Sequence, residues 1–111
     1  MIQLTAQTKI LLATTPADFR CGIDGLAALC RLKLKHDPRC QTLFVFINRS
    51  KTMIRALAYD GTGFWLMTKR LSKGKFSGWP TTGVINALAA TELRALLSGE
   101  SYSHGKANLG L

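Results

Sequence analysis

Acidic side chains are scarce in this 111-residue sequence, which holds six Asp and Glu residues against fifteen Lys and Arg. A metal-dependent nuclease site needs two or three carboxylates that converge on one point. Asp24 and Glu92 instead suit the first turns of helices, and Asp60 suits a tight turn. The P-loop, the dinucleotide fingerprint and the GxSxG and HExxH motifs are also missing. We therefore expect no catalytic residues, no enzymatic activity and no cofactor.

Long apolar runs are missing as well. The longest, LFVFI at residues 43–47, is far too short to span a bilayer. The amino-terminal segment has one lysine and only a short apolar run, unlike a secretory signal. These features predict a cytoplasmic protein with no membrane partner and no small-molecule substrate.

Cysteine is rare, and Cys21, Cys30 and Cys40 form no CxxC motif. Their odd number is typical of reduced thiols in a cytosol. Cys30, His36 and Cys40 are close in sequence, but structural zinc needs four closed ligands and no fourth is evident. We therefore predict no metal, and we interpret Cys30 as a small apolar residue of a helix core. Cys21 would be a nucleophile only beside a base, which the sequence does not show.

Hydrophobic periodicity predicts a single α+β domain, in which an antiparallel β-meander packs against one main helix. The expected elements are a short strand at 8–14, the main helix at 23–34, the meander strands at 42–48, 53–59 and 64–70, and a short helix at 91–99. The DGTG sequence at 60–63 is a strong hairpin signal between the last two strands. We expect residues 1–99 to form the domain and residues 100–111 a polar, flexible tail.

The two helices carry further signals. Gly25, inside the main helix, costs about 1 kcal/mol relative to alanine, and we attribute it to close approach to a neighbouring strand. The apolar stripe of this helix consists of Ile23, Leu26, Ala27, Cys30 and Leu34. In the short helix, Thr91 is the expected N-cap and Gly99 the expected end.

Positive charge is the most informative feature that is present. The formal net charge of +9 favours a polyanionic partner, with nucleic acid as the first candidate. The turns of a meander fall at alternating ends, so the loop at 48–52 and the turn at 71–74 share one end of the sheet. The DGTG turn lies at the other end. Basic residues of both loops should therefore meet.

The register of the hairpin extends this group. If Tyr59 lies opposite Phe64, then Arg55 lies opposite Thr68, near the same end. The resulting basic rim consists of Arg49, Lys51, Arg55, Lys69, Arg70, Lys73 and Lys75. Clustered cations repel one another, so such a rim favours contact with phosphates, which supply affinity without sequence information. The alternative is that these lysines only protect a sheet edge from aggregation.

The aromatic side chains of the meander allow two interpretations. Most should belong to the core, because one face of the sheet must be covered by the main helix. Trp65 and Trp79 are the candidates for stacking on bases or for contact with a partner.

Three segments together carry a family resemblance: ATTPADFRCGIDGLAAL, LFVFINRSK and YDGTGFWLMTKRLSKGKFSGWP. Over roughly residues 10–99 the chain resembles the TnpB (Orf-two) accessory proteins of IS-sixty-six-type bacterial insertion sequences. Cys21 stands where the family usually has a basic residue, and the ending SYSHGKANLGL is unlike the family's usual close. The RNA-guided nuclease that shares the TnpB name is a different, much longer protein.

The resemblance implies a non-catalytic protein of DNA transposition that works beside a separate transposase. On this basis we expect DNA, at the element ends or the target, and the transposase as partners. Asp18 and Arg20 of the DFR sequence form either an exposed partner contact or a local salt bridge at the helix start. The alternatives are an adaptor that docks on the transposase without binding DNA, and an RNA-binding regulator of the element.

Overall fold

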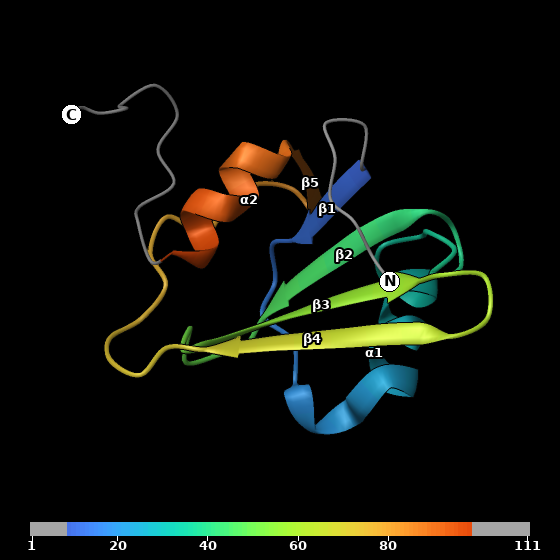
Figure 1. Cartoon of the computed structure of the whole chain (residues 1–111), viewed down its shortest axis with the longest axis horizontal. Coiled ribbons are helices and arrows are strands. Elements are labelled where there is room, and N and C mark those ends of the chain that lie inside the picture. Colours follow the sequence, from blue (N-terminus) through green and yellow to red (C-terminus); the bar gives the residue numbers. More distant parts are fainter. Residues whose placement is uncertain (1–8, 99–111) are drawn as a thin grey trace.

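The computed structural model describes residues 9–98, which form one five-stranded sheet with a helix on each face (Figure 1). The elements in chain order are β1 (Lys9–Ala13), the short 3-10 helix η1 (Phe19–Cys21), α1 (Gly22–Leu32), β2 (Thr42–Ile47), β3 (Met53–Tyr59), β4 (Phe64–Arg70), β5 (Ile85–Leu88) and α2 (Ala90–Leu97). The expected α+β class is confirmed. The expected tail at 100–111 and helix end at Gly99 lie outside the described residues.

The sheet has the order β4-β3-β2-β1-β5. Strands β2, β3 and β4 are consecutive and antiparallel, so the predicted meander is confirmed. Strand β1 pairs parallel to β2, and α1 lies in the crossover that a parallel connection requires. The sequence pattern does not predict β5, because its four residues, INAL, are too few to show an apolar alternation. They form a strand by pairing with β1.

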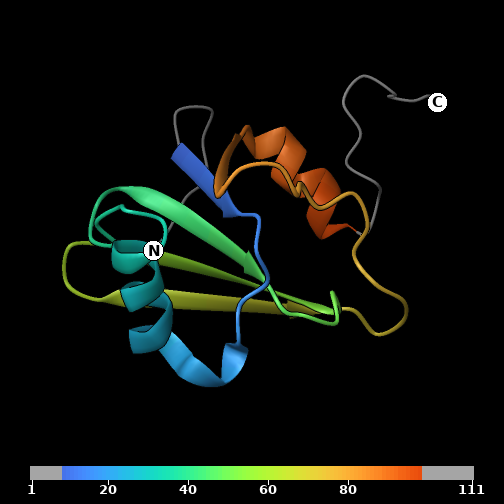
Figure 2. The same cartoon turned by 180° about the vertical axis from the view of Figure 1, so that it is seen from behind.

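Helix α1 covers one face of the sheet (Figure 2). Leu26, Ala27 and Cys30 of the predicted stripe are buried against the fully buried Phe44 and Phe46 of β2. This confirms Cys30 as a core residue, and burial raises the pKa of its thiol to about 12. The other two members of the stripe fall at its ends. Ile23 is exposed, whereas Leu34 is buried although the helix has already ended.

Both ends of α1 differ from the prediction in informative ways. The side chain of Asp18 accepts the backbone N–H of Arg20 at 3.0 Å, which starts η1 and leads into the helix. We expected Gly25 to face a neighbouring strand, but it faces the preceding turn at Cys21 instead. A Cβ at this position would lie 2.2 Å from the Cβ of Cys21. The helix ends at Leu32, and the chain then turns away at Lys35, which has a left-handed conformation with φ 58°, while His36 N donates to Cys30 O at 2.9 Å.

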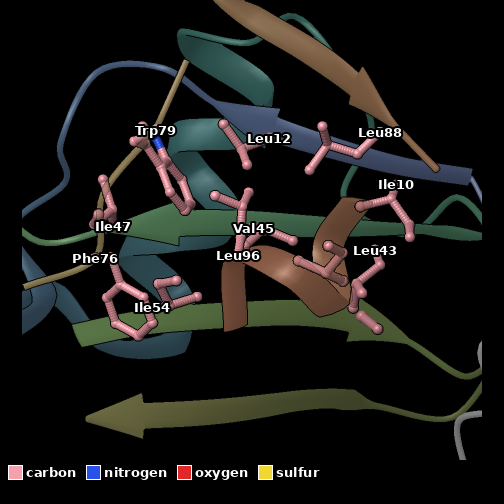
Figure 3. Packing of buried hydrophobic residues seen from close by; sticks show 12 residues of the cluster. Ile10, Leu12, Leu43, Val45, Ile47, Ile54, Phe76, Trp79, Leu88 and Leu96 are labelled. Atoms are coloured by element: carbon pink, nitrogen blue, oxygen red, sulfur yellow. The ribbon is translucent and has the colours of Figure 1, made fainter. Parts of the chain in front are cut away.

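The second face is covered by α2 and by the segment that follows β4 (Figure 3). That segment contributes Phe76 and Trp79, and α2 contributes Leu93 and Leu96; all four are buried. We expected Thr91 to be the N-cap of α2. The helix begins at Ala90, however, so Thr91 already lies inside the first turn. The side-chain cap comes from within the helix instead of from the N-cap residue, because the Glu92 carboxylate accepts the N–H of Ala89 at 2.8 Å.

Candidate nucleic-acid interface

The loop between β2 and β3 is held by the side chain of Asn48. Its Oδ1 accepts the N–H groups of Thr52 at 2.9 Å and Met53 at 3.1 Å, and its Nδ2 donates to the Thr52 hydroxyl at 3.2 Å. Lys51 completes the turn in a left-handed conformation with φ 64°. Arg49 and Lys51 are both exposed on this braced loop.

The segment after β4 lies against this loop. Leu71 N donates to Thr52 O at 3.0 Å, and Phe76 N donates to Lys51 O at 2.8 Å. The side chain of Phe76 is buried and anchors the segment on the α2 face of the sheet. In Figure 1 the β2–β3 loop and the segment after β4 lie at the left end of the sheet, and the hairpin turn at 60–63 lies at the right. The predicted gathering of the two loops is therefore confirmed.

The predicted register of the hairpin is confirmed as well. Tyr59 lies opposite Phe64 and Arg55 opposite Thr68. This places the seven predicted rim residues at or near the same end, but they form two groups. Five are exposed and make no side-chain hydrogen bond or ion pair with the described part of the chain, namely Arg49, Lys51, Arg70, Lys73 and Lys75. We call these five the free rim cations.

Arg55 belongs to the second group, because it is bound by the protein. Its Nη1 donates to the carbonyl of Phe19 at 2.7 Å and its Nε to the Thr68 hydroxyl at 3.1 Å. The guanidinium carbon also lies 4.9 Å from the centre of the Phe19 ring. Arg55 therefore connects β3 and β4 to η1, and its Nε and Nη1 donors are used within the fold.

Lys69 is the other member of the bound group. Its side chain lies on the α2 face, opposite Ile54, and its Nζ donates to the carbonyl of Leu97 in the last turn of α2. A cation at this position satisfies one of the orphan carbonyls of the helix and suits the negative end of its dipole. Lys69 therefore contributes to the docking of α2 on the sheet.

One carboxylate lies near the rim. The backbone N–H of Ala17 donates to Ile47 O at 2.8 Å, which brings the DFR segment to this end of the sheet. Asp18 forms a salt bridge of 2.8 Å with Arg20, and both side chains are exposed. Its hydrogen bonds with Arg20, assisted by the charge of Arg49, lower the pKa of Asp18 to about 2. Asp18 is thus ionised at neutral pH, but Arg20 already binds it.

The two tryptophans occupy different environments. Trp65 is 46% exposed on the α2 face of β4, and its Nε1 donates to Asp60 Oδ2 at 2.7 Å. Trp79 is 7% exposed, and its Nε1 donates to the carbonyl of Ala13 at 2.9 Å inside the core. Trp79 therefore offers almost no surface for a base or a partner, and of the two only Trp65 lies open to solvent.

The remaining reactive side chains do not gather into a metal site in the part of the chain that the structure describes. Within residues 9–98 no group of three or more His, Cys, Asp and Glu side chains lies close enough together to hold a metal ion. Cys30 is buried, whereas Cys21 is exposed and Cys40 partly so. None of the helices in the described part of the chain is long and apolar enough to cross a membrane.

Two residues that shape the rim were not predicted from the sequence. Asn48 braces the β2–β3 loop, and Phe76 anchors the segment after β4. An Asn at the end of an apolar strand, five positions before the next strand begins, is a detectable turn signal. The anchoring of Phe76 carries no comparable signal, because it depends on the tertiary fold.

Comparison with known proteins places the chain in a family. It matches the family described as IS66 Orf2 like protein over residues 8–107. Two uncharacterized proteins of Sinorhizobium fredii are similar to it. One, y4hO, is 36% identical over 105 residues, which cover 94% of this chain and 90% of the relative. The other, y4jC, is 35% identical over 106 residues, which cover 96% and 91%.

No solved structure matches the chain. The family match covers the three segments on which the resemblance was based, and the two relatives align with almost the whole chain. The resemblance inferred from the sequence is confirmed: the chain belongs to the IS66 Orf2-like family, the accessory proteins of IS66 insertion sequences.

Proposed function

We propose that this accessory protein contacts DNA through its free rim cations and assists a separate transposase during transposition. The observation that carries the proposal is the difference between the two groups of rim residues. Five exposed cations, four on two braced loops and Arg70 at the end of β4, have no carboxylate within salt-bridge distance in the described part of the chain. Cations held together without counter-charge are favourable when an anionic partner supplies it.

The geometry of the rim suits phosphates better than bases. Lysine and arginine side chains on loops reach the phosphate backbone, which positions a protein without reading sequence. Trp65, the one exposed tryptophan in the described residues, already donates its N–H to Asp60 and lies near the opposite end of β4. We therefore infer that the rim binds DNA with little sequence preference, and that the transposase supplies specificity.

The test is a titration of labelled duplex DNA with the protein over a salt series. Five phosphate contacts predict a slope of log K against log salt of about −4 to −5. An element-end duplex and a scrambled duplex should give similar slopes and similar affinities. A flat salt dependence, or no binding at low salt, would refute the proposal. Tighter binding of structured RNA than of duplex DNA would favour a regulator of element expression.

A second candidate function is an adaptor that docks on the transposase without DNA. The exposed Trp65 and Met67 on β4 favour it, because such side chains are enriched where proteins meet. Co-purification with the transposase in high salt and nuclease distinguishes the two functions. A DNA-bridged complex dissociates under these conditions, whereas an apolar contact persists.

A further inference from the structure

Strand β4 is a bare edge of the sheet. Among the described residues no element pairs with its outer side (Figure 1). Proteins usually blunt such edges with proline, a bulge or a central charge. Strand β4 has no proline, its register runs without a bulge from Phe64 to Arg70, and its charges occupy only the last two positions. In its middle, Trp65 is 46% and Met67 41% exposed. An exposed apolar edge of this kind is prone to pair with another strand.

The register shows which backbone groups face outward. Asp60 N donates to Gly63 O, and Leu71 N to Thr52 O, at the two ends of the β3–β4 ladder. Hydrogen-bonded and non-hydrogen-bonded pairs alternate in an antiparallel ladder. It follows that the backbone groups of Trp65, Met67 and Lys69 bond to β3. The outward set consists of Phe64, Leu66, Thr68 and Arg70.

The side chains of β4 are complementary to a second, antiparallel copy of the same strand. The strand has seven residues, with Met67 at its centre. Pairing about Met67 puts the ring of Trp65 opposite Lys69 of the second copy, on the α2 face. It also puts Phe64 opposite Arg70 of the second copy, on the other face. Both are pairs of an aromatic ring with a cation.

We propose that two copies of this chain pair edge to edge through β4, antiparallel, about a two-fold axis at Met67. All four outward residues then lie in hydrogen-bonded pairs, because Phe64 meets Arg70 and Leu66 meets Thr68 of the second copy. The two Met67 side chains face each other at the closely spaced, non-hydrogen-bonded position. The result is a continuous ten-stranded sheet with an isologous interface.

The charges agree with this arrangement. The Lys69 side chains of the two copies lie four positions apart along the paired strands, on the order of 14 Å, beyond the Debye length of about 8 Å at physiological salt. The basic end of each β4 meets the hairpin turn of the other copy, where Asp60 lies. Hydrogen bonds from Thr62, Trp65 and Gly63 lower the pKa of Asp60, so this turn is anionic at neutral pH.

The proposal does not depend on DNA binding, because four of the five free rim cations lie outside β4 and only Arg70 is part of the paired strand. The two interactions also respond to salt in opposite directions. Salt weakens phosphate contacts, but it screens the repulsion between two chains of net charge +9. A dimer without DNA binding, or DNA binding without a dimer, would each separate this inference from the proposed function.

Charge exchange at the two-fold axis is the decisive experiment, performed on the full chain without DNA. Met67→Lys and Met67→Glu each place like charges face to face, which disfavours pairing. Sedimentation velocity should show that the dimer dissociation constant of each variant is at least about tenfold higher than that of the native chain, which corresponds to about 1.4 kcal/mol. An equimolar mixture of the two should recover the dimer, which a folding defect cannot produce. Met67→Leu is the control and should dimerise like the native chain.

Amide hydrogen exchange tests the same pairing without a substitution. As the protein concentration rises, the amides of Phe64, Leu66, Thr68 and Arg70 should become protected, while those of their neighbours in β4 are protected throughout. A native chain that stays monomeric over the series overturns the proposal, and so do variants that dimerise unchanged. Protection that appears only when transposase is added also overturns it, since the edge would then hold a strand of another protein.

Discussion

The two ends of the sheet use their charged side chains in different ways. At the hairpin end, the Asp60 carboxylate accepts hydrogen bonds from Thr62, Gly63 and Trp65, and the Arg39 guanidinium lies 6.0 Å from the centre of the Tyr59 ring. At the rim end, five cations make no side-chain hydrogen bond or ion pair in the described part of the chain. At the hairpin end the charges of Asp60 and Arg39 support the fold, whereas most of the charge at the rim is available to a partner.

The largest expected effect comes from removing free charge at the rim. Replacing Lys51, Lys73 and Lys75 with alanine should weaken binding to duplex DNA by at least about tenfold at moderate salt. The slope of log K against log salt should become shallower by about 0.9 for each phosphate that the variant no longer neutralises. The stability of the fold should stay nearly constant, because these side chains are exposed. Fluorescence anisotropy over a salt series measures the first effect and thermal unfolding the second.

The chain offers a closely matched control for this variant. Lys9, Lys33 and Lys35 are also exposed, and they lie toward the hairpin end of the sheet, near the start of β2. Lys35, like Lys51, has a left-handed backbone, with φ 58° against 64°. Both triple variants change the net charge from +9 to +6, since each removes three lysines. Equal loss of DNA affinity in the two variants would show that total charge, rather than the rim, governs binding.

The next largest effect is expected at Arg55, and it concerns the stability of the fold rather than DNA affinity. Arg55→Ala should lower the free energy of unfolding by about 2 kcal/mol, because it removes a charge-assisted hydrogen bond and leaves the Phe19 carbonyl without its donor. The salt slope of DNA binding should not change. Arg49→Ala is the control and should alter stability by less than about 0.5 kcal/mol. Chemical denaturation distinguishes them, and equal stability of the two variants would contradict the division of the rim.

This division marks the limit of what the sequence predicts. Local patterns give the meander, its register and the gathering of the two loops, because strand periodicity and turn residues are properties of short segments. The bound state of Arg55 depends on η1, which lies 36 positions away in the sequence. Trp65 and Trp79 look alike in sequence, and only the path of the segment after β4 buries one of them. The partner that each side chain finds within the fold therefore cannot be predicted from local patterns.

Strand β5 and α2 illustrate the same limit at the far edge of the sheet. Helix α2 is predictable from its own pattern, apart from its first residue. Strand β5 is not, because its four residues are stabilised by pairing with β1 rather than by their own pattern. Lys69 likewise looks like the other rim cations in the sequence, and only the structure shows that it donates to the carbonyl of Leu97 in α2.

A smaller effect is expected at Lys69. Lys69→Met keeps most of the apolar stem and removes the cation at the last turn of α2. The expected decrease in the free energy of unfolding is about 0.3–1 kcal/mol, typical of a charge at a helix terminus. Lys75→Met removes an equal charge from a free rim position and should leave stability unchanged. Amide hydrogen exchange in α2 should accelerate in Lys69→Met but not in Lys75→Met. Equal exchange rates in the two variants would contradict the contribution of Lys69 to the docking of α2.

The smallest predicted effect tests the hairpin end by pH. The folded-state pKa of Asp60 is lowered, chiefly by the N–H of Thr62 and then by the indole of Trp65. Its contribution to stability is therefore complete above the usual Asp pKa, near 4, and disappears as the pH falls through the lowered value. The indole N–H resonance of Trp65 should shift over that acidic range, as its acceptor is protonated. The N–H of Trp79 donates to the carbonyl of Ala13, which does not titrate, so its resonance is an internal control. In Asp60→Asn the acidic shift of Trp65 should vanish. If it persists, another group controls that indole, and the charge of Asp60 does not support the turn.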